Sequence, residues 1–209
     1  MTSILFDFNG TISDDEPLLC AIFQELFAQV GRPLSEREYF DRLAGLADRE
    51  IVSTWLGRED DDIVARKIEL YGGRVADGRT VDEETRAAIR LAVEQAPAAV
   101  VSGASRDEIE PVLAAAGLAD AFTAIVAMED VERGKPDPAG YRRALELLGI
   151  EAPAAVAIED SPPGIAAARA AGLRCAALTR TFPAERLPAD LHAHRVDRAL
   201  IRRLGSAAC

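Results

Sequence analysis

The chain has 209 residues, of which 49% are hydrophobic, and its formal net charge is −11. This length can bury one hydrophobic core and leaves room for a smaller inserted unit. The negative charge would repel nucleic acid and anionic membrane surfaces, so we expect neither as a partner. No apolar run approaches the roughly 20 residues of a membrane-spanning helix, and no secretory signal is visible at the N-terminus. The cysteines are widely spaced and form no C-x-x-C pair, which argues against a disulfide framework and favours a cytoplasmic protein: Cys20, Cys175 and Cys209.

Short apolar runs between turn residues predict five buried strands, at residues 4–8, 98–101, 124–127, 154–158 and 175–178. Segments with helical periodicity separate the later strands, at residues 84–96, 106–116, 138–149 and 163–171. The last 25 or so residues resemble a further turn, strand and helix. Strands that alternate with helices of this length predict an α/β fold with a doubly wound, mostly parallel, Rossmann-like sheet.

Local signals mark the starts of some of these helices. Ser105 to Glu108 and Ser35 to Glu38 have the capping-box pattern, in which a serine and a glutamate each bind the backbone of the other. Asp137 followed by Pro138 fits an N-cap residue with proline at the first helical position.

Residues 15–80 interrupt the alternation of strands and helices. Their apolar residues recur at helical spacing and include no strand pattern. We therefore expect a bundle of about four helices, inserted after the first strand as a cap domain at 15–80. The α/β core domain would consist of residues 1–14 and 81–209.

Polar residues follow the apolar runs at the ends of four predicted strands. Parallel strands bring their carboxyl ends to one edge of a sheet, where ligands bind. The residues concerned are Asp7, Asn9, Gly10 and Thr11 after the first strand, Ser102 and Gly103 after the second, Lys135 after the third, and Glu159 and Asp160 after the fourth. Each alone is a common turn or cap residue, but their joint occurrence predicts a site. Carboxylates brought this close repel unless a cation neutralises them, and oxygen ligands suit Mg²⁺.

Two of these residues are rare in the chain. Asn9 is its only asparagine, and Lys135 is one of two lysines, the other being Lys67, among 24 basic residues. In a chain that otherwise uses arginine, a retained lysine suggests a need for a compact point charge.

The segments that contain these residues resemble the motifs of the haloacid dehalogenase-like hydrolase superfamily over nearly the whole chain. The matches are DFNGT at Asp7, Ser102, Lys135 in GKPDP, and Glu159-Asp160 in IEDSPPGIAAARAAG. The insert after the first strand is similar to the small helical cap of the beta-phosphoglucomutase and phosphoglycolate phosphatase branch. Within it, Gly45 to Arg49 looks like the cap loop that faces the substrate.

The resemblance implies a role for each matching residue. Asp7 would attack phosphorus and form an aspartyl-phosphate, and Lys135 would neutralise charge. Ser102 and the Gly103 amide, with Gly10 and Thr11 nearby, would bind the phosphoryl oxygens. Mg²⁺ would be held by Asp7, Asp160, the backbone carbonyl of Asn9 and, through water, Glu159. Arg49 could bind a second anionic or hydroxyl-bearing part of the substrate, and Glu16 lies at the hinge. The resemblance implies a small phosphorylated metabolite as substrate and a monomer or homodimer.

Asn9 departs from the pattern of the superfamily's phosphatases, which have a second aspartate there as proton donor and acceptor. An amide cannot transfer a proton, and loss of such a group typically costs ~10²–10⁴ in rate. Three explanations remain open: a natural variant in which another group takes over, a deliberate replacement of an aspartate, or a slow relative that binds phosphorylated ligands.

Other activities also remain open at this stage. They are phosphomutase activity, metal-independent haloacid dehalogenation, and phosphonate hydrolysis through a Schiff base on Lys67. A phosphoacceptor receiver domain has similar residues, but in another order and without a helical insert.

Overall fold

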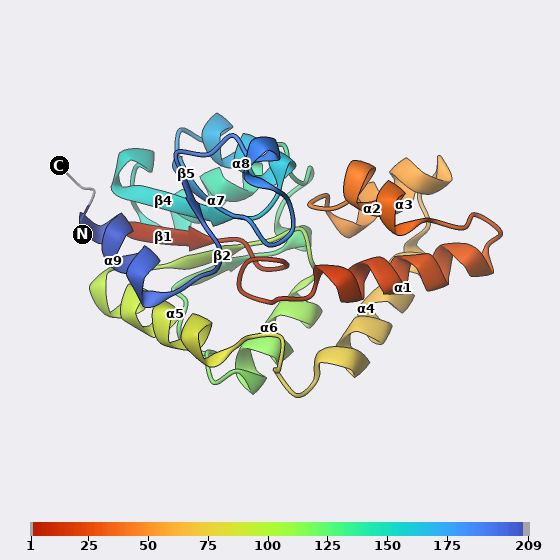
Figure 1. Ribbon diagram of the computed structural model, residues 1–209, viewed down its shortest axis with the longest axis horizontal. Helices are drawn as coiled ribbons and strands as arrows, with labels where there is room; N and C mark the ends of the chain where they lie inside the picture. The colour runs from red at the N-terminus through yellow and green to blue at the C-terminus, as the bar shows by residue number, and fades with distance from the viewer. Residues whose placement is uncertain (1, 207–209) are drawn as a thin grey trace.

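The computed structural model describes residues 2–206, which contain a parallel sheet with the strand order β3-β2-β1-β4-β5-β6 (Figure 1). The strands are β1 (Ser3–Phe6), β2 (Ala99–Val101), β3 (Ala124–Val126), β4 (Ala155–Glu159), β5 (Arg174–Leu178) and β6 (Leu191–Ala193). In register, Phe6 pairs with Val100 on one side and with Ile158 on the other. The central strand β1 thus ends level with β2 and β4. This arrangement confirms the predicted fold class, with strand ends shifted by one or two residues.

Helices cover both faces of the sheet (Figure 1). On one face α7 (Ala139–Leu148) packs on β2 and β3, and α8 (Pro162–Ala170) packs on β4 and β5. On the other, α5 (Glu83–Gln95) packs on β1 and against α9 (Arg198–Ser206), with α6 (Arg106–Ala115) beside them. Three short 3₁₀ turns, η1 (Met128–Asp130), η2 (Ala152–Ala154) and η3 (Ala184–Arg186), occur in the connections.

The predicted helix starts are close to the observed ones. Glu108 accepts a hydrogen bond from the Ser105 amide at 3.2 Å, as a capping box requires. The expectation for Asp137 was wrong by one residue, because Pro138 is the N-cap of α7. Asp137 nevertheless caps the helix from outside, since its carboxylate accepts a hydrogen bond from the Ala139 amide at 3.0 Å.

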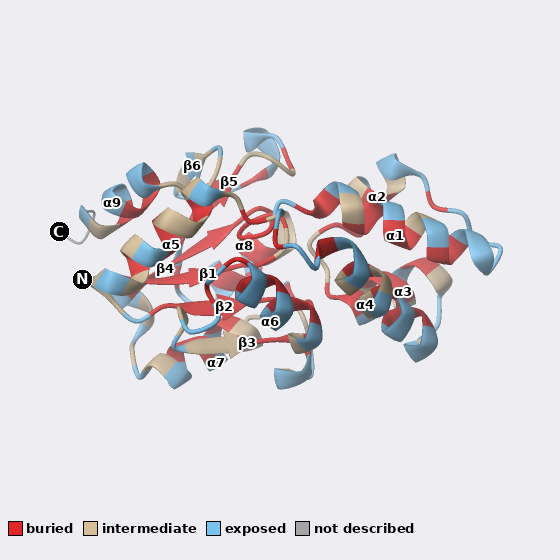
Figure 2. Cartoon of the chain, turned by 90° about the horizontal axis from the view of Figure 1, so that it is seen from below, coloured by how far each residue is buried: buried red, intermediate tan, exposed pale blue. Residues whose placement is uncertain are grey.

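Four helices follow β1 and form a separate bundle at the right of Figure 1. They are α1 (Glu16–Gln29), α2 (Glu36–Arg42), α3 (Asp48–Leu56) and α4 (Asp61–Val75). Figure 2 shows that their buried faces turn towards one another, where Phe27 stacks between Phe23 and Trp55. The bundle thus has an aromatic core of its own, and we retain residues 15–80 as the proposed cap domain.

The bundle lies in direct contact with the carboxyl edge of the sheet. Gly45, in the loop before α3, has φ +87°, and a Cβ atom there would come within 2.4 Å of the Ser161 Cβ. The Gly134 amide donates a hydrogen bond to Glu50 of α3 at 3.1 Å. Cap and core therefore enclose the space above the strand ends.

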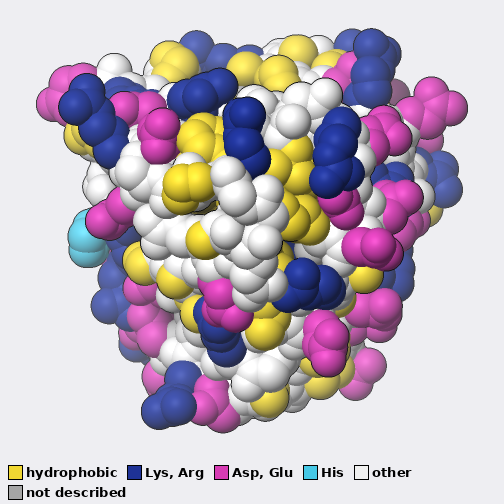
Figure 3. Space-filling model, turned by 90° about the vertical axis from the view of Figure 1, so that its right-hand side faces the viewer, with side chains coloured by type: hydrophobic (Ala, Val, Ile, Leu, Met, Phe, Trp, Pro, Cys, Tyr) yellow, Lys and Arg dark blue, Asp and Glu magenta, His cyan; other side chains and the backbone are white. Residues whose placement is uncertain are grey.

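Figure 3 shows the surface at the cap end of the molecule, where acidic and basic side chains alternate with hydrophobic ones. None of the helices in residues 2–206 has the length and apolar character needed to cross a bilayer. Cys20 and Cys175 are buried free thiols, and Cys209 lies outside the described residues.

Candidate active site

Asp7 and Lys135 meet at the carboxyl end of β1. The Asp7 amide donates to the Ile158 carbonyl at 2.9 Å, which extends the pairing with β4 and fixes the direction of the Asp7 side chain. Lys135 Nζ lies 2.5 Å from Asp7 Oδ1 and 2.6 Å from Glu159 Oε1. All three side chains are buried. Residues from three separate segments thus form one charged cluster, as the strand order predicts.

Three carboxylates share this cluster with a single lysine. Asp7, Glu159 and Asp160 each have an oxygen within 4.8 Å of the others. Burial, opposed by Lys135 and reinforced by Glu159, raises the pKa of Asp7 to about 7. Burial and the adjacent Asp7, Glu16 and Glu159 hold the pKa of Asp160 well above its usual range. A divalent cation would relieve this repulsion, and the all-oxygen donor set fits Mg²⁺.

The carboxylates differ in how many hydrogen bonds they already accept. Glu159 accepts from Tyr141 at 2.7 Å, from Ser161 at 3.2 Å and from the Asp160 amide at 3.3 Å, besides its ion pair with Lys135. Asp160 accepts from the Thr181 hydroxyl. Asp7 and Asp160 therefore retain more capacity for a cation, whereas Glu159 chiefly fixes Lys135.

Gly10 allows Asp160 to approach the first loop. It has φ +70°, and a Cβ atom there would come within 1.9 Å of Asp160 Oδ2, so any other residue would displace that carboxylate. Thr11 is fully buried, and its hydroxyl has no hydrogen-bond partner among the described residues. Arg180 donates to the carbonyls of both residues at 3.3 Å and so holds the loop.

The side chain of Asn9 has a defined partner, Asp15. Asn9 Nδ2 donates to Asp15 Oδ2 at 3.0 Å, and the Gly10 amide donates to Asp15 Oδ1 at 3.1 Å. The Tyr71 hydroxyl from α4 also donates to Asp15. Asp15 is buried, which raises its pKa. An aspartate at position 9 would place two carboxylates in contact, so the surroundings of position 9 match an amide.

A cavity opens above the cluster, between the cap and the strand ends, and we call it the active-site cavity. Seventeen residues line it: Asp7, Asn9, Glu16, Leu19, Phe23, Tyr39, Gly45, Leu46, Asp48, Ile51, Lys67, Ser102, Gly103, Ala104, Lys135, Asp160 and Ser161. Most of the predicted site residues thus share one space. Ser102 faces it with a hydroxyl that accepts from the Ala104 amide at 3.0 Å.

The comparisons with known proteins agree with this geometry. The family model described as haloacid dehalogenase-like hydrolase matches residues 4–178. The chain belongs to the haloacid dehalogenase-like hydrolase family. It is 32% identical over 188 residues to validoxylamine A 7'-phosphate phosphatase of Streptomyces hygroscopicus subsp. limoneus, covering 88% of each chain. It is 30% identical over 185 residues to phosphoglycolate phosphatase of Yersinia pseudotuberculosis serotype I, covering 84% of this chain and 80% of that one.

A solved structure resembles this haloacid dehalogenase-like hydrolase over most of its length. It is an aspartate-to-asparagine variant of CbbY from Rhodobacter sphaeroides in complex with xylulose-(1,5)bisphosphate. The two chains superpose with a TM-score of 0.82 at 29% identity, covering 94% of this chain and 95% of that one. The relatives named here are phosphatases of small phosphorylated metabolites or are solved with such a compound.

Glu16, whose role the sequence left open, lies in the cavity of this hydrolase. It is the first residue of α1, and its carboxyl group accepts from the Tyr39 hydroxyl at 3.1 Å. Burial and the adjacent Asp15 carboxylate raise its pKa to about 8. Glu16 is therefore mainly protonated at neutral pH.

Lys67 lies in a buried ion cluster that the sequence did not predict. Its Nζ lies 3.0 Å from Asp48 Oδ1 and 2.6 Å from Glu108 Oε1, which joins α4 and α3 to α6 of the core. Burial opposes the charge of Lys67, but the two carboxylates outweigh it and raise its pKa. A Schiff base needs a neutral amine, so this environment disfavours the phosphonate-hydrolysing alternative.

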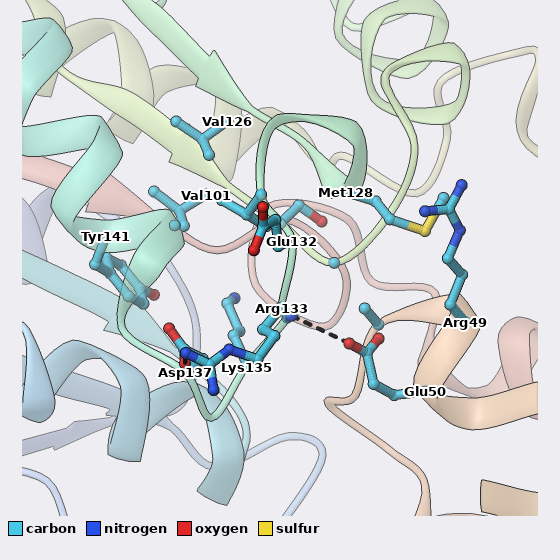
Figure 4. A pocket seen from close by; sticks show the side chains of 16 residues that line it. Arg49, Glu50, Val101, Val126, Met128, Glu132, Arg133, Lys135, Asp137 and Tyr141 are labelled. Carbon is cyan, nitrogen blue, oxygen red and sulfur yellow. Dashed lines mark hydrogen bonds and ion pairs between the residues drawn. The ribbon is translucent and has the colours of Figure 1, made fainter. Parts of the chain in front are cut away.

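Arg49 is exposed and lines a second cavity, next to Glu50, Met128 and Arg133 (Figure 4). This second cavity adjoins the active-site cavity, because Ser102, Gly103 and Lys135 line both. Asp48, one residue earlier, lines the active-site cavity instead. Neighbouring helical residues point in directions about 100° apart, and this separates the two side chains.

Proposed function

We propose that the chain is a magnesium-dependent phosphohydrolase of a small phosphorylated metabolite, with Asp7 as nucleophile. The observation that carries the proposal is the contact of Asp7 with Lys135 beside Asp160, at the base of the active-site cavity. A buried carboxylate next to one fixed ammonium group matches the needs of phosphoryl transfer, in which catalysis consists of positioning and charge stabilisation.

In this mechanism an Asp7 carboxylate oxygen attacks phosphorus, and the bond from phosphorus to the leaving oxygen breaks. Lys135 neutralises negative charge on Asp7 and on the phosphoryl group, and Ser102 with the Gly103 amide donates hydrogen bonds to phosphoryl oxygens. Water then attacks the phosphorus of the aspartyl-phosphate, which releases inorganic phosphate and restores Asp7.

Asp7, Asp160 and the Asn9 carbonyl would hold Mg²⁺, with Glu159 behind them. Bound Mg²⁺ supplies positive charge that offsets the repulsion between the carboxylates and the phosphoryl group.

The leaving oxygen needs a proton that Asn9 cannot supply. We place this role on Glu16, because it lines the same cavity as Asp7 and because burial raises its pKa to about 8, which favours the protonated form at neutral pH. After the first step its carboxylate can accept a proton from the attacking water. The role that a second aspartate performs in the family's phosphatases would then lie on the cap.

Phosphate release from a panel of phosphorylated sugars and small acids tests the proposal, with Mg²⁺ and with a chelator. We expect Mg²⁺-dependent release and, after rapid quenching, a protein mass increased by one phosphoryl group that Asp7→Asn abolishes. Release that continues in chelator, or a phosphorylated Asp7→Asn protein, would refute the mechanism. Binding of phosphorylated compounds without any release would favour the ligand-binding alternative.

A further inference from the structure

The cap side of the active-site cavity contains one basic residue. Among the described residues that line the cavity, only Lys67 and Lys135 are basic, and Lys135 is engaged with Asp7 and Glu159 at the base. Lys67 is therefore the cation that could meet the part of a substrate remote from the reacting phosphate.

The charge of Lys67 is already neutralised within the protein. Asp48 and Glu108 lie at 3.0 Å and 2.6 Å from its Nζ, and all three side chains are at least 94% buried. Two carboxylates around one ammonium group leave the cluster without positive charge. A second phosphate placed here would have to displace Asp48, which lines the cavity, or lie against it.

The other groups on this side favour hydrogen-bond donors and carbon. Glu16 and Asp48 present carboxyl oxygens, which accept hydrogen bonds from hydroxyl or amino groups. Leu19, Phe23 and Ile51 supply apolar surface for a carbon skeleton. Among the described residues that line this side of the cavity, no lysine or arginine is left unpaired to receive an anionic group.

We propose that the cavity selects monophosphates whose remaining part is uncharged or positively charged and rich in hydroxyl or amino groups, and that Asp48 excludes bisphosphates and phosphorylated acids. This proposal rests on the proposed function, which places the reacting phosphate of the substrate at Asp7. It distinguishes the chain from the CbbY variant, whose structure contains a bisphosphate.

The experiment compares four ligands that share one skeleton: glucose 6-phosphate, glucosamine 6-phosphate, 6-phosphogluconate and glucose 1,6-bisphosphate. Their dissociation constants are measured by titration calorimetry of the full chain in chelator, where the proposed hydrolysis does not proceed, and turnover is measured separately with Mg²⁺. We expect glucose 6-phosphate and glucosamine 6-phosphate to bind at least about tenfold more tightly than 6-phosphogluconate and glucose 1,6-bisphosphate, which both have a second anionic group. The amino compound separates the two accepted chemistries: tighter binding than glucose 6-phosphate assigns an ammonium site, and equal binding assigns a hydroxyl site.

Asp48→Asn tests whether the charge of Asp48 causes the selectivity. Asparagine can still accept a hydrogen bond from Lys67, but only Glu108 then neutralises the charge of Lys67. We expect the preference against glucose 1,6-bisphosphate to fall about fivefold to tenfold. Glu69→Gln, at an exposed position of α4, makes the same change in net charge away from the cavity and should leave the preference unchanged.

The proposal is overturned if the original chain binds the bisphosphate as tightly as glucose 6-phosphate, or if both variants shift the preference equally. Calorimetry does not require turnover, so these outcomes remain distinct from a failure of the phosphohydrolase proposal, in which ligands bind but no phosphate is released.

Discussion

The base of the active-site cavity and its cap side both contain buried carboxylates next to a lysine, but they differ in how the charge is balanced. At the base, Lys135 faces Asp7, Glu159 and Asp160. On the cap side, Lys67 is enclosed by two carboxylates. The base has three carboxylates for one lysine, a repulsion that a bound cation would relieve, whereas the cap side has two carboxylates that both contact its lysine. The base is thus suited to bind metal and phosphate, and the cap side to bind an uncharged group.

The largest expected effect is that of Asp7→Asn, which changes the base of the cavity. Loss of the nucleophile should reduce turnover by ~10⁴ or more, while removal of one of three repelling carboxylates should not lower the melting temperature. Steady-state phosphate release and a thermal melt measure the two effects. Retention of more than a tenth of the activity would exclude Asp7 as nucleophile.

Removal of the metal should act on the base alone. A chelator should abolish phosphate release, and Mg²⁺ at ten times its Kd should raise the free energy of unfolding by ~1.4 kcal/mol. Asp160→Asn should lose most of this stabilisation, whereas Asp62→Asn, at an exposed position on α4, should keep it. Equal Mg²⁺ stabilisation in both variants would place the metal elsewhere.

Asn9 and Asp15 lie at the junction of the two regions, and exchanging them tests whether they form a matched pair. Asn9→Asp alone should cost ~1–3 kcal/mol of stability, because it replaces a hydrogen bond with facing carboxylates. The double variant Asn9→Asp/Asp15→Asn restores a donor and an acceptor and should recover at least half of that loss. It also places a carboxyl group two residues after Asp7, but because Glu16 is proposed to supply the proton, we expect phosphate release to change by less than about tenfold; a rise of ~10² would place the proton donor at position 9 instead.

Additive effects in chemical denaturation would show that the two side chains are not coupled. If the double variant is stable but no faster, Asn9 does not limit the rate, and the proton comes from another group.

The two regions also differ in how far the sequence predicts them. Asp7, Ser102, Lys135 and Asp160 follow predicted strands, and parallel pairing brings strand ends together whatever the packing details. The base of the cavity could therefore be assembled from the order of the motifs. Magnesium, and the role of each residue towards it, remain predictions.

The cap side depends on which faces of the cap helices meet each other and the core. Lys67, Asp48 and Glu108 are separated by 19 and 41 residues, and no spacing rule places them together. Helical periodicity predicted the four cap helices but not the rotation of each helix about its axis. This rotation decides that Asp48 lines the active-site cavity and that Arg49 does not, so the sequence could not choose between them. The run of three acids at Asp14, Asp15 and Glu16 is visible in the sequence, but only the structure shows that Asp15 and Glu16 are buried.

The last expected effect is a dependence of stability on pH that arises from Glu16. Its pKa is raised from 4.5 to about 8 in the folded chain, so the folded state binds this proton more tightly than the unfolded state. The contribution is fully present below about pH 4.5 and is lost as pH rises through about 8.

Glu16→Gln keeps an acceptor for the Tyr39 hydroxyl and has no proton to lose. Relative to the original chain, Glu16→Gln should therefore gain about 3.5 kcal/mol in stability between pH 5 and pH 8. Denaturant titrations at a series of pH values measure the difference. A pH-independent difference for Glu16→Gln would mean that Glu16 is ionised in the folded chain, and the proton donor would then have to be sought elsewhere.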